Sequence, residues 1–286
     1  MGNQQETWTL LKVLTWTKEY LAEKGGENAR LEAEWMLCAV LGLDRVGLYV
    51  NFDRLLSDAE LALYRGMVAR RARREPLQYI LGTQEFMELE FDVTPAALIP
   101  RRDTEVLVAE AVKRAVPTGR ILDIGVGSGC IAVALARALP HAEVLGVEKS
   151  AEALALARHN AGKLGARVTL FEGSLLEPFP GQRFDLIVAN PPYIPTGDLD
   201  GLQPEVRDFE PRGALDGGAD GLDFYRLIIP AAPEYLAPGG LLLQEVGIGQ
   251  ADAVQEMIEA TGRFGGLFTA RDTAGIDRVV GGKLST

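Results

Sequence analysis

The second half of the chain alternates short apolar runs with segments whose apolar residues have helical spacing. The apolar runs are RILDI at 120–124, AEVLGVE at 142–148, RVTLF at 167–171 and FDLIVAN at 184–190. The helical segments between the first three are 130–139 and 151–164. Strands of a parallel sheet are buried on both faces, and each needs a crossover, usually a helix, before the next. The alternation therefore predicts βαβ units in a parallel sheet with helices on both faces.

The pattern ends less regularly. We expect a helix within Phe224–Tyr235, interrupted by Pro230 and Pro233, because proline removes a helical N–H and clashes with the preceding turn. The last expected elements are a strand at 240–247, a helix at Gln250–Thr261, and strands at Gly266–Ala270 and Asp277–Gly281 that close the chain as a hairpin.

The first 75 residues have a different pattern. Apolar residues recur at helical spacing in Leu10–Lys24, Glu32–Leu43 and Asp58–Arg74, and Ser57 is a suitable N-cap for the third segment. At 81–97 the period changes to two, which predicts a strand or hairpin that joins two domains. The expected domains are a helical domain at 1–76, a linker with a β-hairpin at 77–100 and an α/β domain at 101–286. The helical part also contains Trp8, Trp16 and Trp35, which we expect to pack in its core.

Charge also separates the two parts. The chain has 29 Lys and Arg and 40 Asp and Glu, a net charge of −11, and all of this excess lies beyond residue 80. Clustered Lys and Arg bind a phosphate backbone, so an acidic α/β part argues against nucleic acid as the main substrate. The exception is Arg65–Arg74, which has five arginines and no acidic residue. It is either a solvated helix face or a docking patch for an acidic surface or RNA.

Several classes of protein are excluded. The chain lacks a run of about 18 uninterrupted apolar residues and a basic segment leading into an apolar core near its start. We therefore expect a soluble, cytoplasmic protein without a membrane partner. The sequence has two cysteines and two histidines in no zinc-binding spacing, so we expect no metal.

A glycine-rich turn is the first candidate site. It ends one strand and opens the next helix, and its residues are Asp123, Gly125, Val126, Gly127, Ser128 and Gly129. Glycines let the backbone approach a ligand and leave N–H groups free at a helix N-terminus. The spacing is G-x-G-x-G, with Cys130 where the dinucleotide fingerprint has its third glycine. Glu148 ends the second strand, where a carboxylate can accept both ribose hydroxyls, so we predict nucleoside binding.

The second candidate site is Asn190-Pro191-Pro192-Tyr193, which follows the fourth apolar run. The two prolines fix φ and lack N–H donors, which leaves the Asn190 side-chain oxygen and the Pro191 carbonyl as rigid acceptors. A planar NH₂ group offers two donors that fit this pair, and Tyr193 supplies an aromatic face. Such a site can orient a poorly nucleophilic amide or aromatic amine and stabilise the positive charge that develops on its nitrogen when that nitrogen attacks an electrophile. No catalytic histidine is expected. The structural alternative is a proline-stiffened loop with a packed tyrosine.

From about residue 120, these features resemble the class I S-adenosylmethionine-dependent methyltransferases. The resemblance implies a Rossmann-like domain with a seven-stranded sheet. It also implies that the glycine turn passes the methionine moiety of S-adenosylmethionine, that Glu148 holds the ribose and that Asn190 lines the cofactor pocket. The product is then S-adenosylhomocysteine. The family's acidic adenine contact after the third strand is replaced here by Ser174 and Leu175, so apolar packing and backbone hydrogen bonds would hold the adenine.

Further segments narrow the resemblance to the protein-(glutamine) methyltransferases that modify peptide-chain release factors. They are 75–82, 84–86, 98–105, 209–211, 214–218 and 220–225. One departure is Arg102, where the family usually has proline. The resemblance implies methylation of the glutamine of a Gly-Gly-Gln motif, with Asn190 and Pro191 as catalytic acceptors, Pro192 beside them and Tyr193 packed on the amide. Residues 1–76 would dock the release factor, and no stable nucleic-acid partner is expected.

Two other enzymatic functions use the same site chemistry. Glutamine methylation of a ribosomal protein would share Asn190–Tyr193, and adenine amino-methylation of nucleic acid is disfavoured by the acidic α/β part. A binding protein without catalysis is a third alternative, although it would have no need for two paired acceptors.

Overall fold

The computed structural model describes residues 7–285, and the chain divides into two compact units. The first unit runs to Gly82 and also includes Pro204–Phe209, and the second comprises Thr83–Gln203 and the chain from Glu210 onward. The expectation that the chain has no basic segment leading into an apolar core near its start concerns in part residues 1–6, which lie outside the described range. Within residues 7–285, no helix is both long and apolar enough to cross a membrane.

The first unit is helical. Its helices are α1 (Leu10–Glu23), α2 (Ala29–Leu41), α3 (Arg45–Val50), α4 (Asp58–Arg71), α5 (Leu77–Leu81) and α9 (Pro204–Phe209). The three predicted helices are confirmed with shifted ends, and Ser57 caps α4 in a capping box with Glu60. Their apolar stripes meet in a core that includes the fully buried Met36 and Leu37. The short helices α3, α5 and α9 were not predicted, because five or six residues carry little periodic signal.

The expectation for the tryptophans is wrong for two of the three. Trp16 is 49% exposed and Trp35 is 45% exposed, whereas Trp8 packs partly against the core. Trp16 stacks on Tyr20 with ring centroids 4.9 Å apart. Most of the exposed large apolar side chains of the described residues also lie in this unit, so its surface carries more of them than the surface of the second unit.

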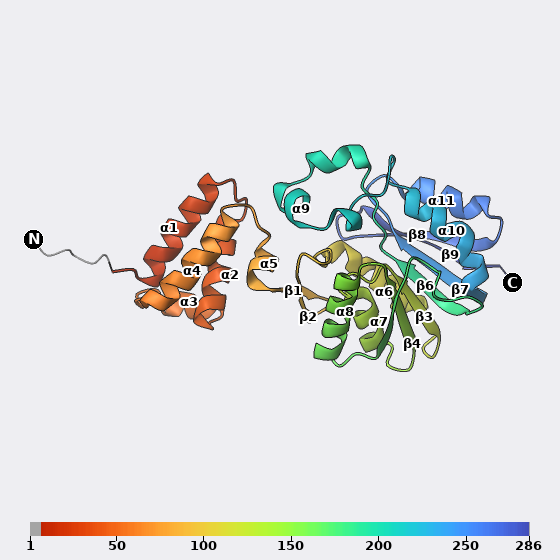
Figure 1. The fold of residues 1–286 in the computed structure, drawn as a ribbon, viewed down its shortest axis with the longest axis horizontal. Coiled ribbons are helices and arrows are strands. Elements are labelled where there is room, and N and C mark those ends of the chain that lie inside the picture. Colours follow the sequence, from red (N-terminus) through yellow and green to blue (C-terminus); the bar gives the residue numbers. More distant parts are fainter. Residues whose placement is uncertain (1–6, 286) are drawn as a thin grey trace, which may run out of the picture. The chain divides into compact units, whose positions relative to one another are not determined.

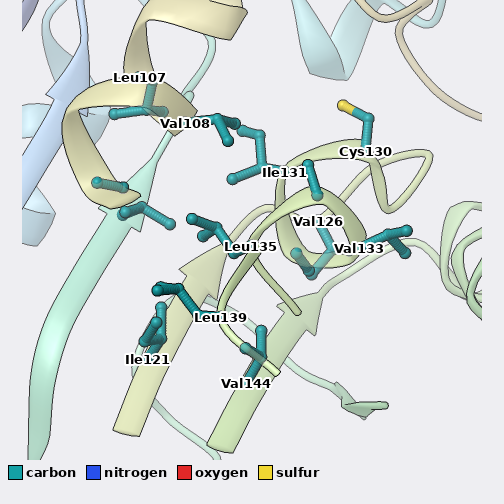
Figure 2. Packing of buried hydrophobic residues seen from close by; sticks show 14 of the residues in the cluster. Leu107, Val108, Ile121, Val126, Cys130, Ile131, Val133, Leu135, Leu139 and Val144 are labelled. Carbon is teal, nitrogen blue, oxygen red and sulfur yellow. The ribbon is translucent and has the colours of Figure 1, made fainter. Parts of the chain in front are cut away.

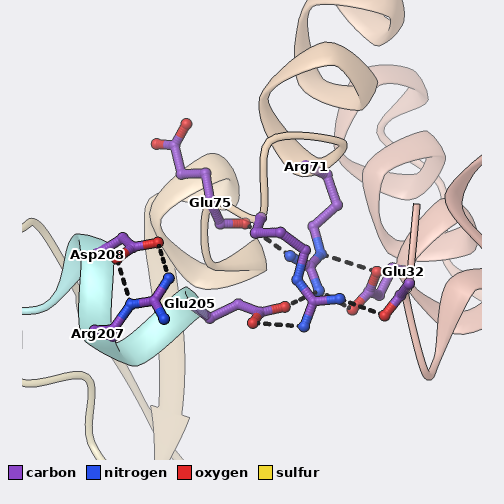
Figure 3. Close-up of polar contacts among 8 residues, drawn as sticks. Glu32, Arg71, Glu75, Glu205, Arg207 and Asp208 are labelled. Atoms are coloured by element: carbon purple, nitrogen blue, oxygen red, sulfur yellow. Dashed lines mark hydrogen bonds and ion pairs between the residues drawn. The ribbon is translucent and has the colours of Figure 1, made fainter. Parts of the chain in front are cut away.

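Most of the arginine run is engaged within the first unit. Arg71 is only 6% exposed, and its guanidinium contacts Glu32 at 2.9 Å and Glu205 of α9 at 2.8 Å (Figure 3). Arg74 reaches the other oxygen of Glu205, also at 2.8 Å, and Arg70 forms a two-bond pair with Glu75. Only Arg65 and Arg73 are exposed. The run is therefore mainly a set of internal ion pairs that attach α9 to α4.

The second unit is built on a sheet of seven strands in the order β5-β4-β3-β6-β7-β9-β8. The strands are β3 (Arg120–Ile124), β4 (Glu143–Glu148), β5 (Val168–Glu172), β6 (Phe184–Ala189), β7 (Leu236–Glu245), β8 (Phe264–Arg271) and β9 (Asp277–Leu284). Strands β3 to β7 are parallel, and β9 is antiparallel to both β7 and β8. The predicted parallel sheet and closing hairpin are confirmed.

Helices cover both faces of this sheet (Figure 1), and successive strand residues enter opposite cores. Ile121 of β3 packs with α6 and α7, whereas its neighbour Leu122 packs in the core that α10 and α11 share. Figure 2 shows the first of these cores, in which Leu107 of α6 and Leu135 of α7 point toward the sheet. The helices of this unit are α6 (Glu105–Arg114), α7 (Cys130–Ala138), α8 (Ala151–Lys163), α10 (Asp223–Tyr235) and α11 (Ala251–Ala260). The 3₁₀ turns are η1 (Arg102–Thr104), η2 (Thr196–Gly201) and η3 (Arg212–Ala214).

Helix α10 corrects one expectation, because it continues through Pro230 and Pro233 without interruption. Its apolar face is fully buried at Tyr225 and Ile228. Burying such side chains is worth about 1.5 to 3 kcal/mol each, which offsets the hydrogen bonds that the prolines cannot make.

A β-hairpin precedes the sheet in the second unit. Its strands β1 (Thr83–Phe86) and β2 (Leu89–Asp92) are antiparallel, as the alternating pattern predicts. The turn residues Met87 and Glu88 have φ of +50° and +61°, which is the left-handed geometry of a type I′ turn. Phe86 and Phe91 pack edge to face in the α6–α7 core, so the hairpin is fixed to the second unit.

We expect Arg71→Met to destabilise the first unit. The change leaves the carboxylate of Glu32, which is 12% exposed, without its partner, whereas Glu205 keeps its ion pair with Arg74. Removing one member of a buried ion pair costs roughly 3 kcal/mol. Urea unfolding of the full-length protein should show this loss, while Arg73→Met at an exposed position should stay within about 0.5 kcal/mol of the parent. Equal effects of the two changes would contradict the internal role of Arg71.

Candidate active site

The candidate site lies where the carboxyl ends of parallel strands meet. From β3 the chain extends the sheet through β4 and β5 on one side, and it later extends through β6 and β7 on the other. The boundary between β3 and β6 is thus a topological switch point, where open α/β sheets bind ligands. The glycine turn follows β3 and Asn190 follows β6, so the fold brings together the two candidate sites.

The glycine turn has left-handed geometry and an open side. Gly125 and Gly127 have φ of +76° and +55°. A Cβ added to Gly125 would meet no atom within 4 Å, and one added to Gly127 would meet only the Cβ of Ala97 and the Gly125 carbonyl, both at least 3.9 Å away. Gly129 differs, because an added Cβ would lie 3.2 Å from the Ala157 Cα on α8. The first two glycines therefore leave room for a ligand, and the third permits close helix packing.

The turn is held from two sides. The N–H groups of Gly125 and Val126 both donate to the Val147 carbonyl of β4, at 2.9 and 3.1 Å. On the other side, Nδ2 of the fully buried Asn160 donates to the Ser128 carbonyl at 2.8 Å and to the Asp92 carbonyl at 3.0 Å. Asn160 thus connects α8, the hairpin and the glycine turn. Sequence reasoning missed this residue, since nothing local distinguishes it from other polar helix residues.

The two acidic residues beside the turn both accept backbone N–H groups. Asp123 is fully buried, and its Oδ2 accepts from Ala132 in the first turn of α7 at 3.1 Å. Its Oδ1 has no hydrogen-bond partner among the described residues. Glu148 accepts from Gly127 through Oε2 and from Ser150 through Oε1, both at 2.9 Å. Each oxygen of Glu148 keeps a second lone pair for an added donor.

Asp123 holds its proton unusually tightly. The pKa of its carboxyl is raised from an ordinary 3.8 to about 7, mainly by burial and also by the nearby charge of Glu148, while the Ala132 N–H opposes the rise. Asp123 is therefore an acid whose ionisation is costly in the folded protein.

The third strand ends beside the same edge. Glu172 ends β5, and the Gly173 N–H donates to the Glu148 carbonyl at 3.0 Å, which places Ser174 and Leu175 near the end of β4. Leu175 has φ of +52°, a left-handed geometry that is costly for a leucine, and its side chain packs on the α10–α11 core. The acidic residue typical of the family at this place is absent, as the sequence indicates.

Asn190-Pro191-Pro192-Tyr193 follows β6 directly. Asn190 Nδ2 donates to Thr104 Oγ1 at 3.1 Å, which leaves Oδ1 of the same amide for another donor. Pro191 is buried, and Tyr193 is partly buried with its hydroxyl 3.4 Å from Glu245 Oε1.

The backbone of this loop is closely packed from behind. Gln250 Nε2 donates to the Tyr193 carbonyl at 2.8 Å, and a Cβ added to Gly221 would lie only 2.3 Å from that oxygen. A Cβ added to Gly217 would lie 2.8 Å from the Pro192 carbonyl. The glycines at 217 and 221 thus allow the loop after Asn190 to be covered by the segment before α10.

Glu245 was not predicted, although it lies at the centre of this end of the site. It ends β7, is 1% exposed, and its carbonyl accepts from the Tyr225 hydroxyl at 2.7 Å. Burial raises the pKa of the Glu245 carboxyl to about 7, while hydrogen bonding from Thr104 and Tyr193 and the charge of Arg278 oppose the rise. A carboxylate at the end of an apolar strand is the signal that could have pointed to it.

Other titratable groups have structural roles. Burial raises the pKa of the Cys130 thiol to about 12, so this cysteine is a packed and unreactive side chain. His159 contacts Asp92 of the hairpin at 2.6 Å. Arg102 begins η1 and is exposed. Among residues 7–285, no cluster of three or more His, Cys, Asp or Glu side chains could hold a metal ion.

Comparison with known proteins first defines the class. A methyltransferase from Pyrococcus furiosus has a similar fold, with a TM-score of 0.56, 17% identity, and coverage of 76% of this chain and 99% of that one. Residues 102–200 match the methyltransferase small domain. The fold and this match define a methyltransferase.

The particular family follows from closer relatives. Residues 12–82 match the PrmC N-terminal domain. A release factor glutamine methyltransferase of Geobacter sulfurreducens is 69% identical over 99% of this chain and 100% of its own length. One from Moorella thermoacetica is 47% identical over 94% of this chain and 96% of its own. The chain belongs to the release factor glutamine methyltransferase family.

The raised pKa of Asp123 predicts a pH dependence of stability. The folded protein binds this proton more tightly than the unfolded chain, so the contribution of Asp123 to stability falls as pH rises from about 4 to about 7. Asp123→Asn cannot ionise and can still accept the Ala132 N–H. We expect its melting temperature to depend less on pH between 5 and 8 than that of the parent, and to equal or exceed the parent's at pH 8. Asp185→Asn on β6 controls for loss of a strand carboxylate, and an unchanged pH dependence in Asp123→Asn would contradict the assignment.

Proposed function

We propose that the protein transfers a methyl group from S-adenosylmethionine to the side-chain amide nitrogen of the glutamine in the Gly-Gly-Gln motif of peptide-chain release factors. The observation that carries this proposal is the orientation of Asn190. Its NH₂ group is engaged by Thr104, so its Oδ1 is left to accept from a substrate NH₂ group. Membership of the release factor glutamine methyltransferase family supports the same acceptor.

The residues around the glycine turn fit S-adenosylmethionine. The open side at Gly125 and Gly127 can accept a ligand close to the backbone, and the carboxylate of Glu148 retains lone pairs for the two ribose hydroxyls. The residues that would hold the cofactor are Asp123, Gly125, Val126, Gly127, Ser128, Gly129, Glu148, Ser174, Leu175 and Asn190. When bound, the cofactor supplies an electrophilic methyl group on a sulfonium and becomes S-adenosylhomocysteine.

The chain's own residues orient the acceptor. Asn190 Oδ1 and the Pro191 carbonyl accept the two N–H groups of the glutamine amide, Pro192 stiffens the loop, and Tyr193 packs against the planar group. Two fixed acceptors orient the nitrogen lone pair toward the methyl group that is transferred and stabilise the positive charge that develops on the nitrogen. No strong base is needed before attack, because the nitrogen proton becomes much more acidic after transfer.

The first unit, with the helical domain at 1–76, is proposed to bind the body of the release factor. A tripeptide offers little area for specificity, and specific interfaces bury about 800 Å² on each partner. Exposed apolar side chains such as Trp16, Trp35 and Phe52 support this role better than the arginine run, which is largely paired internally. In this proposal, residues 77–100 link the docking part to the catalytic part at 101–286.

Asn190→Ala should separate binding from catalysis. We expect the variant to fold and to bind S-adenosylmethionine, but to lose on the order of 10² or more in kcat, as when one preorganised polar group is removed. Calorimetry gives cofactor affinity, and single-turnover transfer gives the rate. Gln255→Ala, which removes a side-chain amide from α11 in the second unit, is the matched control and should turn over like the parent. Undiminished transfer by Asn190→Ala would refute the assigned role.

The substrate is tested by labelled methyl transfer to purified unmethylated release factor, its Gly-Gly-Gln→Gly-Gly-Ala variant, a ribosomal protein fraction and duplex DNA. We expect label on the first alone, and a much higher kcat/KM for the intact factor than for a Gly-Gly-Gln peptide. Label on ribosomal protein or DNA instead would show that the enzyme methylates a different acceptor and would contradict the proposed substrate. Equal turnover of peptide and factor would remove the docking role of the first unit.

A further inference from the structure

Two residues of the proposed acceptor site depend on side chains outside the Asn190–Tyr193 motif. Asn190 Nδ2 donates to Thr104 Oγ1 at 3.1 Å, and the Tyr193 hydroxyl lies 3.4 Å from Glu245 Oε1. Thr104 is 2% exposed and Glu245 is 1% exposed, so water does not compete for these groups. Thr104 ends η1 and Glu245 ends β7, more than 50 residues from the motif on either side.

The hydrogen-bonding capacities of these groups fix the direction of each bond. A threonine hydroxyl has a single proton, and the Thr104 oxygen already accepts from Asn190. Its proton is left for a neighbouring acceptor, and the buried Glu245 carboxyl is available, because its Oε2 has no hydrogen-bond partner among the described residues and Thr104 lowers its pKa. An ionised carboxylate only accepts, so both hydroxyls must donate to it. The hydrogen bonds therefore run in one direction, from Asn190 through Thr104 to Glu245, when Glu245 is ionised, which is the case above its raised pKa of about 7.

This direction decides what Asn190 presents to a substrate. With its NH₂ group engaged by Thr104, the amide presents Oδ1, an acceptor, to the substrate side. A flipped amide would present donors to the donors of a glutamine NH₂ group, and no hydrogen bond could form. The backbone at two of these residues is also fixed. The Tyr225 hydroxyl donates to the Glu245 carbonyl, and Gln250 Nε2 donates to the Tyr193 carbonyl.

We propose that Thr104 and Glu245 are positioning residues that fix the side-chain amide of Asn190 with Oδ1 facing the acceptor nitrogen. The inference rests on the proposed glutamine methylation for its kinetic consequence. Its structural content, the locked orientation of the Asn190 amide, does not depend on which acceptor is methylated.

The test compares Thr104→Val, which keeps the shape and removes the hydroxyl, with Thr104→Ser, which keeps the hydroxyl. In the full-length protein with S-adenosylmethionine and release factor, we expect Thr104→Val to lose about 10-fold to 100-fold in kcat. Its KM for release factor and its cofactor affinity should stay within about 3-fold of the parent. Thr104→Ser should restore most of the rate. Thr261→Val, at the end of α11 in the second unit, removes a hydroxyl that donates to the Ile258 carbonyl at 2.8 Å, and this control should leave kcat unchanged.

Glu245→Gln tests the direction of the hydrogen bonds from Asn190 through Thr104 to residue 245, because a glutamine amide can donate to Thr104 and allow the Asn190 amide to flip. We expect a loss in kcat of about 10-fold or more. The double variant Thr104→Val/Glu245→Gln should lose no more than the worse single variant, since both act through Asn190. The proposal would be overturned if the loss in kcat of the double variant equalled the product of the two single losses. It would also be overturned if Thr104→Val kept the kcat of the parent.

A spectroscopic readout decides the structural part without any acceptor. The two side-chain NH₂ proton resonances of Asn190, assigned by their absence in Asn190→Ala, should exchange slowly with water in the parent and in Thr104→Ser. They should exchange rapidly in Thr104→Val. Slow exchange in Thr104→Val would overturn the proposal even if release factor is not the substrate, whereas label on another acceptor with the expected exchange rates would overturn only the proposed function.

Discussion

The pairing of β3 with β6 is the contact on which the site depends. These strands are far apart in the sequence, and their parallel register sets Ile124 opposite Ala189 at their carboxyl ends. The glycine turn begins at the next residue after one strand, and Asn190 is the next residue after the other. Because strand ends in a sheet lie about 5 Å apart, this register places the glycine turn and Asn190 side by side without any dedicated connecting structure.

Much of the fold could be predicted because its helices and strands have recognisable residue patterns within single segments of the sequence. The strands of the parallel sheet are continuous apolar runs, and Ser57 marks a helix start that the structure confirms. The glycine turn and Asn190–Tyr193 are contiguous in sequence, so they were visible without knowledge of the fold. Their chemical roles remain proposals, since they concern molecules that bind there.

What could not be predicted depends on contacts between distant segments. Thr104, Asn160 and Gln250 support the site from distant parts of the sequence and have no local signature, whereas Glu245 has only its place at the end of an apolar strand. The arginine run failed as a signal for the same reason. Its charge is visible in the sequence, but its partner Glu205 lies more than 130 residues away. The continuity of α10 through two prolines likewise results from burial of its apolar face against the sheet.

The position of α9 has a consequence for the modularity of the chain. The first unit is completed only by Pro204–Phe209, so the chain passes between the units three times, after Gly82, after Gln203 and after Phe209. Two units joined by a single linker can be exchanged, truncated or fused to new partners by cutting once. Here a single cut at Gly82 would leave Arg71 and Arg74 without Glu205, and would leave α9 as an orphan segment within the other unit. The helical and α/β units are therefore expected to be inherited together, and neither is expected to be combined with other domains as a separate module.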